Sequence, residues 1–99
     1  LVPAVEYVQA NRVRRLLVED MARLGVRYWV APSFEGTNLL LTNLSGHPCV
    51  VLPNGFDERG DPVSITFMAG LCDEGGLLEI AKAYQDATGF HLKHPPLFE

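Results

Sequence analysis

Apolar residues recur along residues 5–24 at steps of three and four, the spacing of one face of an α-helix. Charged side chains, including Arg12, Arg14 and Arg15, occupy positions between them and predict a solvated face. Pro3 favours a helix start, and Gly25 favours a helix end. The pattern therefore predicts an amphipathic helix over 5–24 with one apolar stripe: Val5, Val8, Val13, Leu16, Leu17, Met21 and Leu24.

Three shorter segments carry the patterns of β-strands. Residues 27–32 include Trp29 and Val30, which suit a pleated surface. Residues 49–52 are four nonpolar residues between two prolines, which predicts a central strand buried on both faces. Residues 63–69 alternate apolar and polar side chains, as a strand with one apolar face does. Turn-forming residues over 54–62 join the last two segments, so we expect an antiparallel hairpin with a long loop.

A second helix is predicted over residues 73–88. Asp73 suits its N-cap, and Gly89 follows its last residue. Between the first two strands, residues 33–38 indicate a loop, and residues 39–41 fit either a helical turn or an extended piece. Residues 91–99 predict an extended terminal segment. The expected fold is a single α/β domain over 1–99, with a three-stranded mixed sheet flanked by two main helices.

The composition narrows the class of protein. The chain has 99 residues, is 47% hydrophobic and carries a formal charge of −4, which is typical of one folded domain. No apolar run approaches the length of a membrane span, and the acidic balance argues against direct binding of nucleic acid. No signal peptide is recognisable, and Leu1 suggests a segment of a longer protein. We expect a cytoplasmic, reducing location, with Cys49 and Cys72 as small buried side chains.

Residues able to carry catalysis are few. No G-x-S-x-G elbow and no Gly-rich phosphate loop occurs in the sequence. His91 and His94 have no carboxylate or cysteine companion nearby, so neither a metal site nor a cofactor is expected. The sequence therefore predicts no catalytic group among the remaining candidates, which are Ser33, Ser45, Ser64, Lys82, Lys93 and His47.

Four motifs follow one another along nearly the whole chain. Residues 28–33 read Y-W-V-A-P-S, and residues 42–56 contain N-L-x-G-x-P-x-x-x-x-P-x-G-F. Residues 60–67 read G-D-P-V-S-I-T-F, and residues 73–89 contain D-E-x-x-L-L-x-x-A-x-A-Y-Q-x-A-T-G. Together these motifs resemble the carboxy-terminal part of the amidase signature family. The sequence departs from the family's usual residues at Cys49, Ser64 and Thr66, where Ala, Gly and Gln are common.

The resemblance implies an activity and its chemistry. Members of the family hydrolyse carboxamide C–N bonds with a nucleophilic serine that a neutral lysine activates through a second, cis-bonded serine. Backbone N–H groups stabilise the oxyanion. In the family both serines lie in a Gly/Ser-rich signature far upstream, and the catalytic lysine also lies upstream; both are absent from the 99 residues. We therefore expect the chain to be the carboxy-terminal part of such a hydrolase and inactive on its own.

The resemblance also implies partners and a candidate pocket. The chain would pack on the catalytic body of the parent amidase, where its strands join a larger mixed sheet beside a small amide substrate. Thr42, Asn43 and Ser45 precede the strand 49–52 and are the expected pocket residues; alternatively, Asn43 bonds its own backbone in a turn. A second hypothesis is a stand-alone interaction module without catalysis, which forms a homodimer through open sheet edges or the apolar stripe of helix 5–24.

Overall fold

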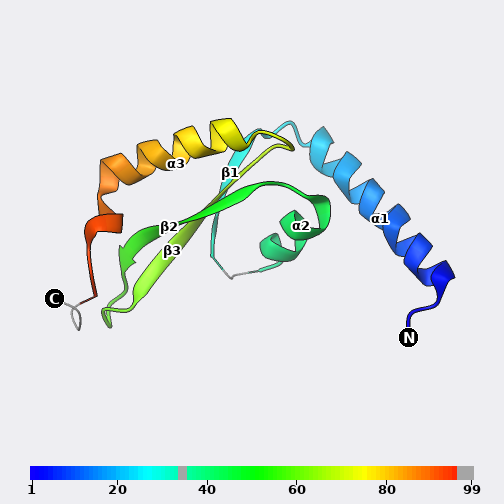
Figure 1. Ribbon diagram of the computed structural model, residues 1–99, viewed down its shortest axis with the longest axis horizontal. Coiled ribbons are helices and arrows are strands. Elements are labelled where there is room, and N and C mark those ends of the chain that lie inside the picture. Colours follow the sequence, from blue (N-terminus) through cyan, green and yellow to red (C-terminus); the bar gives the residue numbers. More distant parts are fainter. Residues whose placement is uncertain (34–35, 96–99) are drawn as a thin grey trace.

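A computed structural model describes residues 1–33 and 36–95 of the chain. The predicted helices and strands are present, and their ends differ from the expected ones by at most one residue, apart from one strand that is longer (Figure 1). The predicted loop 33–38 and terminal segment 91–99 lie partly outside the described residues. The elements are α1 (Ala4–Arg23), β1 (Tyr28–Pro32), α2 (Asn38–Ser45), β2 (Cys49–Phe56), β3 (Pro62–Ala69), α3 (Glu74–Thr88) and the short 3₁₀ helix η1 (Phe90–Leu92).

The three strands form an antiparallel sheet in the order β1-β3-β2. The α/β class and the hairpin of β2 and β3 are confirmed, whereas the expected mixed sheet is wrong for the described residues. The predicted central position of residues 49–52 is also wrong, because β2 is an edge strand and Val51 is 51% exposed. Pro53 cannot donate a backbone hydrogen bond, which an edge strand tolerates and a central strand does not.

Strand β2 continues past its predicted end. Pro53 still pairs with Ser64, and an irregularity in the register separates this pair from Phe56 opposite Pro62. Beyond the strand, Asp57 closes the hairpin, since its carboxylate accepts hydrogen bonds from the backbone N–H groups of Arg59 and Asp61. The turn is therefore held by the side chain of an aspartate, as the turn-forming composition of this segment suggested.

The hydrophobic core lies between α3 and one face of the sheet. Leu77 and Ala81 of α3 are buried together with Phe67 and Ala69 of β3 and Leu52 of β2. Residues 65, 67 and 69 alternate along β3, so they point to the same face. Five half-buried side chains pack against this core: Tyr28, Val50, Ile65, Ile80 and Tyr84.

The start of α3 is tied to β1 by a polar cluster. The Arg27 guanidinium donates a hydrogen bond of 2.8 Å from Nε to Asp73 Oδ2. The hydrogen bond from Arg27, followed by one from Tyr28, holds the pKa of Asp73 below its usual value. Asp73 occupies the N-cap position as predicted, and its side chain binds Arg27 and Tyr28 at the start of β1.

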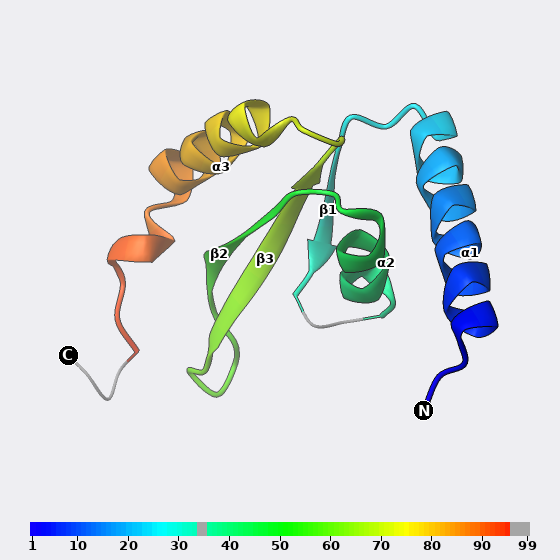
Figure 2. The ribbon, with the colours of Figure 1, turned by 45° about the vertical axis from the view of Figure 1, so that its right-hand side comes forward.

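Residues 39–41, which fitted either a helical turn or an extended piece, belong to helix α2. It runs over Asn38–Ser45 and ends at Gly46, whose φ of 84° is a left-handed conformation that glycine adopts without strain. Asn38 connects this helix to the second face of the sheet: its side chain accepts a hydrogen bond from Trp29 and donates one to the sulfur of Met68. Helices α2 and α3 therefore lie on opposite sides of the sheet (Figure 2).

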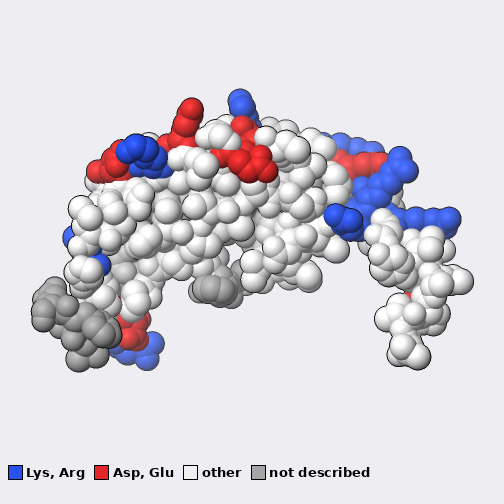
Figure 3. Space-filling model, viewed as in Figure 1, with Lys and Arg blue, Asp and Glu red and all other residues white. Residues whose placement is uncertain are grey.

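Helix α1 projects from the sheet as an arm. None of its residues is buried, and its neighbour among the described elements is α2. The molecule has a radius of gyration of 17.1 Å, against about 13 Å for a compact domain of this length. Its exposed surface is 7,411 Å², whereas a compact monomer of this mass exposes about 5,600 Å². The result is an arch with a hollowed lower side in Figure 3, whose charged side chains gather mostly along its upper side.

Candidate functional site

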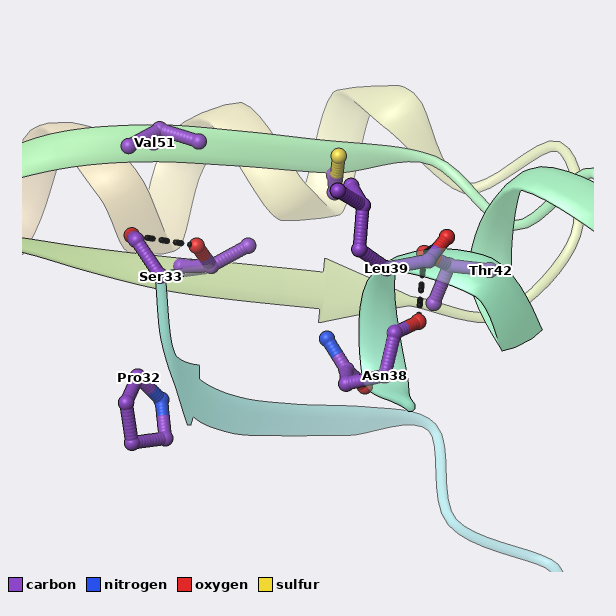
Figure 4. A pocket seen from close by; sticks show the side chains of 8 residues that line it. Pro32, Ser33, Asn38, Leu39, Thr42 and Val51 are labelled. Carbon is purple, nitrogen blue, oxygen red and sulfur yellow. Dashed lines mark hydrogen bonds between the residues drawn. The ribbon is translucent and has the colours of Figure 1, made fainter. Parts of the chain in front are cut away.

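A small cavity opens on the α2 side of the sheet (Figure 4). Its walls come from the end of β1, the first half of α2 and the strands β2 and β3. The cavity has a volume of about 40 Å³, which suits a water molecule but is far below the several hundred Å³ of a typical ligand pocket. The described residues therefore make a wall rather than a complete pocket. The lining residues are Pro32, Ser33, Asn38, Leu39, Thr42, Cys49, Val51 and Thr66.

Two hydroxyl groups meet at this wall. Ser33 Oγ and Thr66 Oγ1 are 2.7 Å apart, and either can be the donor (Figure 4). When one hydroxyl donates to the other, the acceptor's own proton stays available for a third group. The pair can therefore donate one hydrogen bond to a carbonyl oxygen placed in the cavity. Among the residues that the structure describes, those that line the cavity include no Asp, Glu, Lys or Arg.

The three predicted pocket residues have different positions. Thr42 lines the cavity, but its hydroxyl donates to the carbonyl of Asn38 at 3.0 Å, within its own helix. Ser45 is buried and is not among the lining residues. Asn43 is exposed and lies inside α2, not in the turn considered for it. Ser33 and Thr66 were not predicted as pocket residues, although Thr66 occupies a polar position of the alternating strand pattern.

Ser45 and His47 form a serine–histidine pair that has a structural role. Ser45 Oγ lies 2.6 Å from His47 Nδ1 and 2.8 Å from the carbonyl oxygen of Leu41. The serine is 3% exposed, so a substrate cannot reach it. Burial lowers the pKa of His47, whose ring contacts Trp29 edge-on at 5.5 Å between centroids. The pair fastens the end of α2 to the start of β2.

The lysines are engaged away from the cavity. Lys82 Nζ lies 2.7 Å from Asp86 on the exposed side of α3, and Lys93 lies over the ring of Phe90. Neither lysine is among the residues that line the cavity with Ser33. Among residues 1–33 and 36–95, no group of three His, Cys, Asp or Glu side chains could hold a metal ion.

Both cysteines are exposed, so the expectation that they are buried is wrong. Cys49 lies at the start of the edge strand β2, on the face that α2 covers only at one end. Cys72 lies in the loop before α3 with a left-handed φ of 62°, a strained conformation for a residue other than glycine. Neither position belongs to the packed side of the sheet.

The helices of the described part are too short or too polar for any of them to cross a bilayer.

Comparison with known proteins finds relatives named as amidotransferase subunits and as an amidase. The chain is 33% identical to the glutamyl-tRNA(Gln) amidotransferase A subunit of Bordetella petrii, over 90% of its own length and 22% of the relative. It is 41% identical to the same protein from Rhodopirellula baltica over 57% of the chain and 11% of the relative. AmiD of Mycobacterium bovis, which is named as a candidate amidase, is 38% identical over 56% of the chain and 12% of the relative.

These relatives are much longer than the region they share with this chain. The chain spans about a fifth of the length of the amidotransferase subunit of Bordetella petrii. No protein-family model matches the chain, and no solved structure matches it. The relationship to these proteins therefore rests on sequence similarity alone.

Proposed function

The chain is related by sequence to the amidase signature family, as its motifs predicted, and from this premise we propose that it is the wall-forming part of an amide hydrolase. In this proposal a larger protein holds the nucleophile, its activating serine and lysine, and the oxyanion donors. The 99 residues contribute one side of the substrate pocket, and they do not hydrolyse amides by themselves. The reaction of the complete protein adds water across a carboxamide C–N bond and releases an amine or ammonia.

The observation that carries the proposal is similarity over 90% of this chain to one stretch of a much longer protein. Similarity of that extent means that the whole fold described above, and not a single motif, has a counterpart in an amidotransferase subunit. Proteins of one family keep the placement of their functional surfaces more reliably than their substrates. For that reason we propose only that the substrate is a small carboxamide.

The geometry of the described residues supports a contributing role. A nucleophile needs a base within hydrogen-bond reach and a path for substrate. Ser45 has a nearby histidine but no path, whereas Ser33 lies at the cavity beside a threonine hydroxyl and not beside a base. The wall thus offers the hydroxyl pair of Ser33 and Thr66 for a hydrogen bond to an amide, and none of its described lining residues is a histidine, a carboxylate or a lysine. We propose this wall as the surface that faces the substrate and the catalytic body of the parent protein.

An assay of ammonia release tests the proposal. The purified chain is incubated with a panel of short aliphatic, aromatic and amino-acid amides, and ammonia is followed beside a buffer blank. We expect no turnover above the blank. Turnover that disappears on substitution of Ser33, Ser45 or Ser64 by alanine would contradict the proposal, because the chain would then hold its own nucleophile.

The gene offers a second test. Sequencing on both sides of the region that encodes these residues should find a reading frame of several hundred codons with a Gly/Ser-rich segment upstream. A reading frame limited to the 99 codons would instead favour a stand-alone interaction module. The large exposed surface of the chain, 7,411 Å², is the observation that favours this second candidate.

A further inference from the structure

Most of the apolar stripe of α1 has no partner within the described residues, although Leu17 and Met21 are half-buried. Val5, Val13 and Leu24 are 71%, 63% and 65% exposed, and Leu16 is 58% exposed. An amphipathic helix of 20 residues gains most of its stability from burial of its apolar face. A helix that keeps its stripe in water is therefore incomplete, and a second surface should cover it.

A groove continues this stripe at the carboxy-terminal end of α1. It has a volume of about 200 Å³ and runs between α1, β1 and α2. Every side chain that lines it is apolar, so the groove suits aliphatic side chains of a partner. The residues that line the groove are Met21, Leu24, Val26, Trp29 and Leu41.

Six of the seven apolar stripe positions of α1 are arranged symmetrically about the point between Arg14 and Arg15. The seventh, Leu17, falls opposite Arg12 of an antiparallel copy. When the helix is laid antiparallel on a copy of itself about this point, Val13 lies opposite Leu16 of the copy. Val5 then lies opposite Leu24 of the copy. Val8 lies opposite Met21 in the same way, so the amino-terminal half of one helix meets the groove of the other. A two-fold dimer requires this kind of self-complementary surface.

The charges fit the same register. Glu6 lies opposite Arg23 of the copy, which gives two ion pairs related by the two-fold axis. Arg23 has its local partner Asp20 at 3.2 Å, but both side chains are largely exposed, and such a pair contributes little. The central arginines have partners within their own chain, since Arg14 donates to the carbonyl of Leu44 and Arg15 pairs with Glu19.

The surface area is sufficient for such a dimer. The chain exposes about 1,800 Å² more than a compact monomer of its mass. A specific interface of standard size needs only about 800 Å² from each partner. We propose that α1 and its groove are a dimerisation surface on which a second copy of this chain packs antiparallel, with Val5 and Val8 of each copy in the groove of the other. This inference concerns a surface apart from the cavity wall and does not depend on amide hydrolysis.

Light scattering of the 99-residue chain over a wide dilution series tests the proposal. The expected mass is about twice 10.9 kDa at high concentration, with dissociation on dilution. Leu16→Glu places two carboxylates near the two-fold axis and should weaken association by about tenfold or more, since an unpaired charge in an apolar contact is costly. Leu78→Glu is the matched control: Leu78 is 60% exposed on α3, away from α1, and its change should leave the dimer intact.

A charge exchange tests the register. Glu6→Arg and Arg23→Glu should each weaken the dimer, and the double variant should restore it, because the two ion pairs re-form with reversed polarity. Circular dichroism of each variant checks that the fold is unchanged. A mass of 10.9 kDa at every concentration overturns the dimer, as does a dimer that Leu16→Glu leaves unaffected. Failure of the double variant to associate more tightly than both single variants overturns the antiparallel register.

Discussion

The two helices that flank the sheet differ in how they are held. Helix α3 buries Leu77 and Ala81 against β2 and β3, and a cluster of Arg27, Tyr28 and Asp73 fixes its start. Helix α1 is five residues longer and buries none of its side chains. Both helices show an apolar periodicity in the sequence. The difference is that the sheet supplies a partner surface for one helix and not for the other.

This difference assigns separate roles to the two sides of the molecule. The side of the sheet under α3 is a closed core, where substitutions should act on stability. The side that carries α2 has a half-covered surface with the cavity, and the arm α1 adds a second uncovered surface. Substitutions on these surfaces should act on association and ligand contact. The three predictions below test where the boundary between the two sides lies.

The largest effect is expected where neighbouring residues of β2 point to opposite faces. Leu52→Asp places a carboxylate without a partner in the core under α3, and should lower the free energy of unfolding by about 3 kcal/mol or more. Val51→Asp at the half-exposed neighbour should cost no more than about 1 kcal/mol. Urea denaturation of both variants measures the difference. Equal losses would mean that both faces of β2 are buried, as the sequence pattern had suggested.

A smaller effect is expected in the first turn of α3. A Cβ at Gly76 would overlap Tyr28 Oη and approach Asp73 Oδ1 to 2.8 Å, whereas a Cβ at Gly75 meets no atom within 4 Å. Gly76→Ala should therefore destabilise the chain by about 1–3 kcal/mol. Gly75→Ala should stabilise it by up to about 1 kcal/mol, because alanine favours the helix.

Thermal unfolding compares the two glycine variants, and a third substitution identifies the cause. Removal of the hydroxyl in Tyr28→Phe should make Gly76→Ala less costly, since the overlapping atom is gone. If Gly76→Ala were as well tolerated as Gly75→Ala, the close approach of β1 to the start of α3 would be disproved.

The smallest effect is a pH dependence on the α2 side. Burial holds the pKa of His47 below its ordinary value of 6.5. As the pH falls below 6.5, the imidazole is protonated first in the unfolded chain, so stability should fall. Above that pH the contribution is constant. Urea denaturation at neutral and mildly acidic pH measures this, and His47→Asn should show a weaker dependence. An equal acid dependence in this variant would assign the effect to other groups.

The sequence predicted local structure well where one residue type decides the conformation. Gly89, with a φ of 64°, ends α3 at the predicted residue, and the hairpin forms around Asp57. The sequence did not predict α2, because three consecutive leucines, Leu39–Leu41, show no periodicity that would distinguish a helix from a strand. The sequence pattern placed residues 49–52 at the centre of the sheet, because a short apolar run is the same in a buried central strand and in an edge strand.

The candidate site was predicted only in part. Thr42 was predicted at the pocket and lines the cavity, with its hydroxyl bonded inside its own helix. Ser33 and Thr66 are 33 positions apart and meet through the pairing of β1 with β3. A hydroxyl pair of this kind leaves no signal in a single sequence, since neither residue type is unusual at its own position.

The sequence by itself determined the two long helices, the strands and the family resemblance, because these depend on spacing and on motifs that neighbouring residues carry. The tertiary structure decided which strand is central, which helix is covered and which hydroxyls meet. These features depend on contacts between residues far apart in the chain. The free energy of such contacts depends on how much apolar surface of each element is buried against another element. For α3 that surface is the sheet, and for α1 we propose that it is a second copy of the chain.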